Sequence, residues 1–207
     1  MAANVIDKLH HEHANMRRIL ILVRLQLDLL ERQGMPDFVL LTNALYYMRK
    51  FPSIVHHPKE DFIFGKLLAA DASVKQEVDR MRRQHEEIYV LEDRLINLVL
   101  EVQAGKRELC SRLLELGRLY LKTQAEHVET EERVLFPRAL RVLKQKDWKE
   151  VRNKSSSIED PLFGKQVTER YRYLYDYLLH EAADQGLPLS GTSQDPESSS
   201  AKISFSR

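Results

Sequence analysis

Apolar residues recur every three or four positions along most of this chain, a spacing that predicts amphipathic helices. Ile19, Leu22 and Leu25 follow it in the first segment. Sustained alternation of apolar and polar residues, which would predict a strand, is confined to residues 171–177, where the flanking residues favour a helix. The long segments are also rich in Leu, Glu, Arg, Lys and Gln, which are strong helix formers. The pattern therefore predicts an all-α fold.

Four long helices are expected, over residues 4–33, 36–70, 73–103 and 106–143. Gly34 ends the first helix, and Gly105 separates the third from the fourth. Pro52 and Pro58 each remove a backbone donor, so the second helix should bend near its middle. Pro137 marks either a kink in the fourth helix or the end of the part that packs in the core.

The pattern weakens after the fourth helix. A short helical turn is expected over residues 147–151, a polar connection over 153–164 and a tyrosine-rich helix that packs on the bundle over 166–183. The last residues are rich in Ser, Gly, Pro and Asp, a composition typical of disorder. We therefore divide the chain into a four-helix bundle (1–144), a connection with a C-terminal helix (145–183) and a disordered tail (184–207).

Composition excludes several classes of protein. The 32 basic and 31 acidic residues give a net charge of +1, so no overall field favours nucleic acid or an anionic membrane. The single cysteine excludes an internal disulfide framework and fits a reducing compartment. The longest apolar run, Ile19–Val23, is far shorter than the ~20 residues that span a bilayer. Residues 1–7 lack the features of a secretory signal. We expect a soluble, cytoplasmic protein with no membrane partner.

Two of the eight histidines are each followed by a glutamate four residues later. His56 precedes Glu60 in the second helix, and His127 precedes Glu131 in the fourth. Residues four apart lie on one face of a helix, so each pair can direct an imidazole and a carboxylate to one point. Alone, such a pair is usually an exposed ion pair worth tenths of a kcal/mol, about 0.2–0.5.

The spacing between the pairs indicates an internal repeat. His56 and His127 are 71 residues apart, as are Glu60 and Glu131. A lone histidine, His13, lies in the first helix, and His85 follows it by 72 residues in the third. The chain thus contains two similar helical hairpins, each with a lone histidine and a His-x-x-x-Glu.

The same register selects among neighbouring residues. His57 and His10 do not match the repeat, so His56 and His13 are preferred. His10, His11, His57 and His180 are expected to be solvated or to lie beside the site. Three acids adjoin predicted ligands but point about 100° away round the helix, where they are either solvated or orient an imidazole; they are Glu12, Asp61 and Glu132.

Four histidines and two glutamates suit a pair of metal ions in a helix bundle. With both glutamates bridging, each ion receives two imidazoles and two carboxylate oxygens. Six-coordinate iron would keep about two positions for solvent, an oxo or hydroxo bridge, or an incoming dioxygen species. Zinc prefers about four ligands, often with thiolate in structural sites. The donor set therefore favours two non-haem iron ions.

The sequence resembles the hemerythrin-like (HHE cation-binding) family over roughly residues 5–180. The supporting segments are Leu9–His13, His56–Phe64 and His127–Pro137, and Asp160–Gly164 is similar to a downstream segment of bacterial members. The resemblance implies an up-down-up-down four-helix bundle around a di-iron centre. One iron would be bound by His13 and His56 and the other by His85 and His127, with Glu60 and Glu131 bridging.

One position departs from the family pattern. Oxygen-carrying hemerythrins have a fifth histidine one turn after the lone histidine of the third helix, whereas this chain has Tyr89 there. Tyr89 would ligate iron, hydrogen-bond to a bound oxygen species, or only pack. The departure argues against ordinary oxygen carriage.

Three functions remain open on the sequence. The first is a di-iron protein that binds O2, peroxide or nitric oxide for oxygen or redox sensing or for storage. The second is a catalase-like enzyme that decomposes peroxide. The third is an iron-responsive regulatory protein without catalysis, whose protein partner the sequence does not identify. We favour the first.

Overall fold

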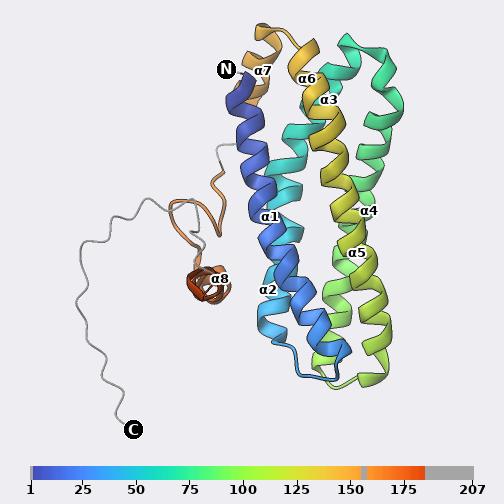
Figure 1. Ribbon diagram of the computed structural model, residues 1–207, viewed down its shortest axis with the longest axis vertical. Coiled ribbons are helices and arrows are strands. Elements are labelled where there is room, and N and C mark those ends of the chain that lie inside the picture. Colours follow the sequence, from blue (N-terminus) through green and yellow to red (C-terminus); the bar gives the residue numbers. More distant parts are fainter. Residues whose placement is uncertain (1, 155–157, 185–207) are drawn as a thin grey trace, which may run out of the picture.

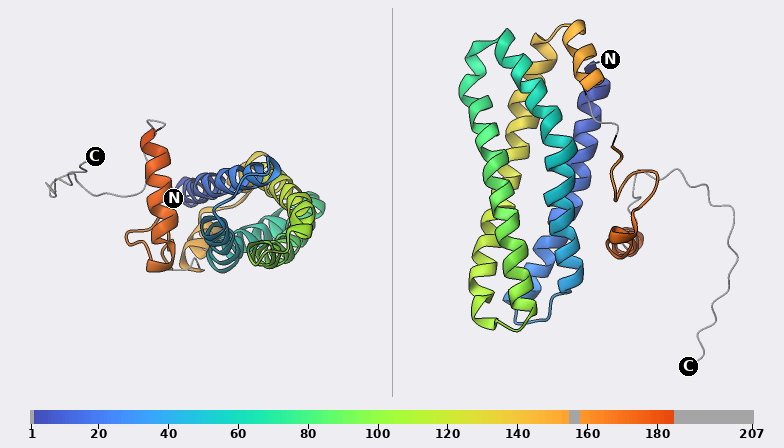
Figure 2. Two further views of the ribbon diagram at one scale, coloured as in Figure 1. Left: turned by 90° about the horizontal axis from the view of Figure 1, so that it is seen from below. Right: turned by 180° about the vertical axis from the view of Figure 1, so that it is seen from behind.

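The computed structural model describes residues 2–154 and 158–184, and all regular structure among these residues is helical. Four long helical segments run up, down, up and down around a common axis (Figure 1, Figure 2). They comprise α1 (Ala2–Glu31), α2 (Phe38–Phe51) with α3 (His57–Ala70), α4 (Lys75–Gln103), and α5 (Cys110–Thr130) with α6 (Phe136–Val142). The predicted all-α bundle is confirmed. In the part of the chain that is described, no helix is long and apolar enough to cross a membrane.

The second and fourth segments each contain a π-helical turn, η1 (Pro52–His56) and η4 (Glu131–Leu135). The N–H of His57 donates to the carbonyl of Pro52, and the N–H of Phe136 donates to that of Glu131. A proline follows each donor, and its missing N–H interrupts the α-helical hydrogen bonds there. The bends expected from the prolines therefore take the form of wide turns, and helical structure continues beyond both.

Two turns at one end of the bundle connect its helices within each hairpin. Gly105 has a φ of 101°, a backbone conformation that strains a residue with a side chain, and it separates α4 from the 3-10 turn Arg107–Leu109 before α5. At the end of α1 the positive φ of 59° belongs instead to Gln33. Gly34 follows it and donates its N–H to the carbonyl of Leu29, 2.9 Å away. Both predicted helix ends are found at these glycines.

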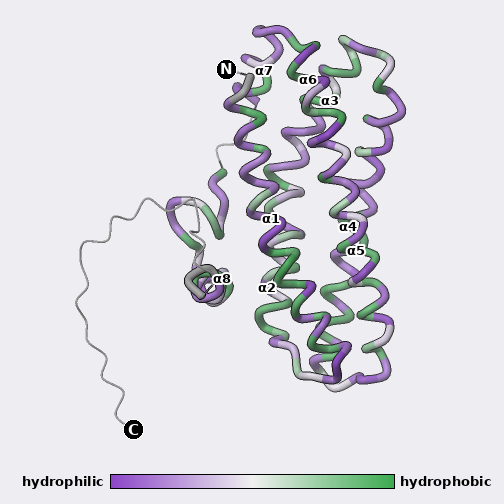
Figure 3. The backbone as a smooth tube through the Cα atoms, viewed as in Figure 1, coloured by the Kyte–Doolittle hydropathy of each residue, from purple (hydrophilic) through white to green (hydrophobic). Residues whose placement is uncertain are grey.

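The apolar interior is divided into two clusters, and each long helix passes from one to the other. The larger cluster includes Met16, Val55, Ile88 and Tyr120, and the smaller includes Leu9, Ile63, Met81 and Leu135. Hydrophobic and hydrophilic positions accordingly alternate along every helix of the bundle (Figure 3). The residues between the clusters on each helix are the predicted metal ligands, which therefore form a polar layer across the bundle.

The segments after the bundle are more ordered than the sequence pattern indicates. The expected turn at 147–151 is a full helix, α7 (Gln145–Lys154), which buries Trp148 and Val151 in the smaller cluster. A 3-10 turn, Glu169–Tyr171, precedes α8 (Arg172–Asp184). That helix packs against α2 and runs across the bundle, so Figure 1 shows it end-on.

The connection between α7 and α8 is not purely polar, as the sequence had suggested. Leu162 and Phe163 are buried in the larger cluster, and Tyr47 donates a 2.8 Å hydrogen bond to Asp160. Apolar contacts with the bundle thus fix a segment whose own sequence has no periodic pattern. The division of the chain at residues 144 and 183 stays a prediction. Nearly all of the predicted tail, 185–207, lies outside the described residues.

Candidate metal centre

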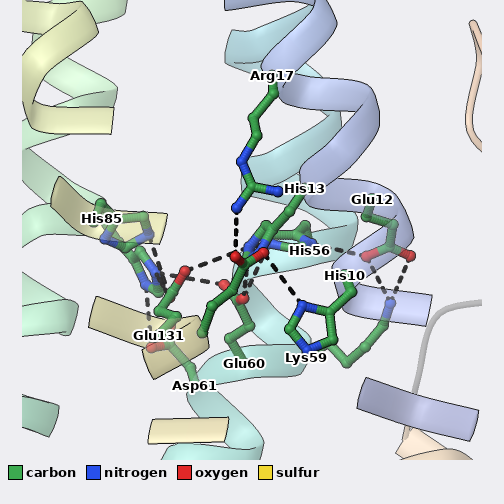
Figure 4. A network of polar contacts seen from close by, with 12 residues as sticks. His10, Glu12, His13, Arg17, His56, Lys59, Glu60, Asp61, His85 and Glu131 are labelled. Atoms are coloured by element: carbon green, nitrogen blue, oxygen red, sulfur yellow. Dashed lines mark hydrogen bonds and ion pairs between the residues drawn. The ribbon is translucent and has the colours of Figure 1, made fainter. Parts of the chain in front are cut away.

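The structure brings the six predicted ligands together from all four helical segments (Figure 4). Each of them is buried, with His85 the most exposed at 9%. They lie on successive elements of the bundle: His13 on α1, His56 at the end of η1, Glu60 on α3, His85 on α4, His127 on α5 and Glu131 at the start of η4. The two π-helical turns therefore each contribute a ligand position.

The first group of donors comprises His13, His56, Glu60 and Glu131, whose ligand atoms lie within 4.8 Å of one another. Nε2 of His56 is 3.0 Å from Oε1 of Glu60. Nε2 of His13 is 3.4 Å from that same oxygen and 3.4 Å from Oε2 of Glu131. Two imidazoles from the first hairpin thus face one oxygen of each glutamate.

The second group comprises His57, Glu60, His85 and His127, again within 4.8 Å of one another. Nε2 of His85 is 3.7 Å from Oε2 of Glu60 and 3.7 Å from Oε1 of Glu131. Nε2 of His127 lies 3.3 Å from Oε1 of Glu131. Each glutamate therefore directs one oxygen to the first hairpin's histidines and the other oxygen to the second hairpin's, as a bridging carboxylate would.

The atoms that face the centre are buried without hydrogen bonds. Within the described residues, neither oxygen of Glu60 or Glu131 has a hydrogen-bond partner, nor has Nε2 of His85 or His127. Leaving such groups unsatisfied costs about 1–3 kcal/mol each, and more for charged groups. Bound cations would satisfy all of them, so the donor set fits a pair of metal ions.

Every predicted histidine ligand has its other ring nitrogen held by an oxygen acceptor. Within each hairpin, the residue just before the lone histidine orients the histidine of the next helix. Glu12 lies 2.8 Å from Nδ1 of His56, and Oε1 of Gln84 lies 3.4 Å from Nδ1 of His127. Glu12 and Gln84 are 72 residues apart, the same separation as the lone histidines that follow them.

Between the hairpins, the residue just after each glutamate has the equivalent role. Asp61 lies 3.2 Å from Nδ1 of His85, and Glu132 lies 2.9 Å from Nδ1 of His13. Ionised carboxylates only accept hydrogen bonds, so each Nδ1 carries a proton and Nε2 presents its lone pair to the centre. The three acids adjoining the ligands thus orient imidazoles, the second of the two roles that the sequence allows.

Two of these acids are themselves held by cations. Glu12 is buried and accepts hydrogen bonds from Nζ of Lys59 at 2.9 and 3.1 Å. Glu132 pairs with Arg17, 2.5 Å away, and with His10, 3.3 Å away. Partial burial raises the pKa of Glu132, but its contacts with His13, Arg17 and His10 lower it more, to about 2. Both carboxylates therefore stay ionised and keep their histidines oriented.

The charges inside the layer favour a cation. Burial raises the pKa of Glu60, but His56 and His13 lower it further, to well below its usual range. Burial lowers the pKa of His85, but Asp61 and the two inner glutamates raise it more, to about 10. An anionic pair of carboxylates thus holds protons on the neighbouring imidazoles, a place that metal ions would take.

The structure leaves Tyr89 outside the centre. Its side chain is 44% exposed, and the guanidinium carbon of Arg49 lies 3.0 Å from the centre of its ring. No group of candidate donors among the described residues includes it. His11 and His180 are exposed, as expected.

His57 is the residue that the sequence analysis set aside wrongly. It was expected to be solvated or beside the site, yet it is buried at 8% exposure and belongs to the second group of donors. The repeat could not reveal it, because the matching position of the second hairpin is Val128. The available signal was the adjacent His-His pair three residues before Glu60, on a helix with a proline in its first turn.

Comparison with protein families gives a match to the hemerythrin HHE cation-binding domain over residues 4–139. No match is found among curated proteins or among solved structures. The matched segment holds all six predicted ligands and the four residues that orient the histidines, and it ends before α7. With most of its length covered by this match, and with its buried histidines and glutamates gathered between four antiparallel helical segments, the chain belongs to the hemerythrin HHE cation-binding family.

Proposed function

We propose that this chain is a non-haem di-iron protein that binds O2, peroxide or nitric oxide at a carboxylate-bridged iron pair, for oxygen or redox sensing or for storage. The observation that carries the proposal is the division of the two glutamates. Each of Glu60 and Glu131 offers one oxygen to His13 of the first hairpin and the other to His85 of the second.

In this proposal one iron is held by His13 and His56, the other by His85 and His127, and the glutamates are shared. When bound, iron supplies open coordination positions and redox capacity for small oxygen or nitrogen ligands. The donors are nitrogen and oxygen atoms only, and they exceed the four that zinc prefers. That donor set supports iron over zinc.

The surroundings suit a small ligand. Phe136 stacks on the ring of His13, with centroids 5.6 Å apart, and apolar clusters lie on both sides of the polar layer, so bulk water is kept from the donors. A surface cavity of about 560 Å³ between α1 and α5 is lined by residues that include Arg17, Val128 and Glu132. It provides an approach beside His13 for a molecule of a few atoms.

Metal analysis followed by optical spectroscopy tests the proposal. Protein purified without added metal should contain about two iron ions per chain and should show near-ultraviolet and visible bands that change on addition of O2, peroxide or nitric oxide. A colourless protein that contains only zinc would overturn the iron assignment. Sustained release of oxygen from peroxide would instead favour the catalase-like enzyme. Iron-dependent stability coupled to binding of a protein partner would favour the regulatory function.

A further inference from the structure

His57 is a buried imidazole without a polar partner. It is 92% buried, and among the described residues its ring makes no hydrogen bond or ion pair. Its nearest aromatic contact is His85, whose ring lies parallel at 13° with centroids 4.1 Å apart. The ring of His127 is 5.8 Å away. An imidazole held among two other imidazoles and Glu60 has donor chemistry that packing alone does not require.

We propose that His57 is a fifth histidine ligand, which gives the metal position of His85 and His127 three imidazoles while that of His13 and His56 keeps two. The inference rests on the proposed pair of metal ions, but not on their being iron. The fifth nitrogen then comes from α3, and Tyr89 of α4, at the position that holds the fifth histidine in oxygen carriers, takes no part.

The local backbone explains how two consecutive histidines both reach the centre. The π-helical turn of η1 ends at His56, and the N–H of His57 closes that turn on the carbonyl of Pro52. His56 directs Nε2 to Glu60 Oε1 at 3.0 Å, on the side of the first hairpin's histidines. His57 lies one residue further round the helix, against the histidines of the second hairpin.

The repeat also shows why only one position gains a ligand. The residue of the second hairpin that matches His57 is Val128, which follows His127 as His57 follows His56. Val128 is apolar, and it lines the cavity of about 560 Å³ between α1 and α5 together with Arg17 and Glu132. The position held by His13 and His56 therefore lacks a third imidazole and lies on the side with space for a small molecule. The two metal ions are inequivalent, and the external ligand binds at the first.

Nuclear magnetic resonance of full-length protein labelled with 15N-histidine and loaded with Zn(II) tests the assignment. A ring nitrogen bound to zinc has its own chemical shift and does not titrate, so bound histidines can be counted among the eight. We expect five, with His10, His11 and His180 free. Loss of the fifth bound signal in His57→Ala identifies it, and Val128→Ala, the matched control, should keep all five. A bound set that excludes His57 overturns the inference.

A competition titration with a chromophoric chelator adds a second readout. We expect His57→Ala to weaken one of two Zn(II) sites by tenfold or more, whereas Val128→Ala leaves both unchanged. Circular dichroism of each variant reports whether the fold is retained, and the count on the unmodified protein holds even if His57→Ala does not fold. Zinc bound by four histidines defeats only the role of His57. Zinc bound by none defeats the proposed metal pair as well.

Discussion

Oε2 of Glu12 lies 2.8 Å from Nδ1 of His56, so a carboxylate on α1 fixes the orientation of a predicted ligand at the end of η1. The same carboxylate is the hydrogen-bond acceptor for the buried ammonium group of Lys59. Burial tends to raise the pKa of Glu12, but His56 and Lys59 lower it below its usual value. This one acid therefore serves both the metal centre and the balance of buried charge.

Glu12→Ala should impair stability and metal binding together. Its removal leaves Lys59 as a buried cation without its partner, which costs about 3–5 kcal/mol in other proteins. Loss of the acceptor at His56 should weaken metal binding by about 10- to 100-fold. Urea denaturation of the metal-free protein and titration with Zn(II) measure the two effects. Glu12→Gln keeps an oxygen acceptor and should fall between the two. Unchanged metal affinity in Glu12→Ala would show that this contact does not orient a ligand.

His127→Ala should strip iron from the protein and destabilise the fold. It removes an inward-facing nitrogen whose partner, Glu131, is buried and has no hydrogen bond among the described residues. His180→Ala is the matched control, because His180 is exposed and its replacement should leave iron content unchanged. Iron per chain measured by plasma emission spectrometry compares them. Equal iron content in the two variants would refute the ligand assignment.

The bundle and the six clustered residues follow from repeated features that one sequence contains. The helical spacing of apolar residues locates the four segments, and the matching separations of His13 from His85 and of His56 from His127 select the histidines. The apolar residues on either side, such as Leu9 and Met16 around His13, place the polar layer between two clusters. Features that obey the repeat are thus predictable.

Features that break the repeat or depend on tertiary contacts are not predictable in this way. His57 faces Val128 in the repeat, so comparison of the hairpins counts against it although it is buried beside His85. The length of α7 depends on burial of Trp148 and Val151 by the bundle, which its local sequence does not specify. The choice of partner by each orienting acid depends on which helix lies opposite, and sequence position gives only its direction round its own helix.

Tyr89→Phe should leave iron content and the visible spectrum unchanged. The Tyr89 side chain is half-exposed and stacks with Arg49, and a phenylalanine ring can keep that contact. Stability should change by no more than about 0.5 kcal/mol, as for other surface substitutions. A phenolate ligand to iron would give an intense visible band. Disappearance of such a band in Tyr89→Phe would show that the tyrosine ligates iron after all.

Glu92 is a buried acid on α4, in the part of the bundle that holds the larger apolar cluster. Burial is the main cause that raises its pKa, from 4.5 to about 8; hydrogen bonds from Tyr120 and Gln124 and the charge of Arg49 oppose the shift, and Asp93 adds to it. The side chain is therefore protonated in the folded protein at neutral pH, whereas the unfolded chain releases that proton above about pH 4.5.

The folded state thus binds more protons than the unfolded state between these two pKa values, so this group's contribution to stability declines as pH rises through that window. The slope is at most about 1.4 kcal/mol per pH unit. Glu92→Gln removes the titration, so its stability relative to the unmodified protein should increase from pH 5 to pH 8, on the order of 1 kcal/mol or more. Free energies of unfolding of both metal-free proteins in urea measure the difference, in which the titration of the shared histidines and glutamates cancels. A difference that does not vary with pH would mean that Glu92 is ionised in the fold.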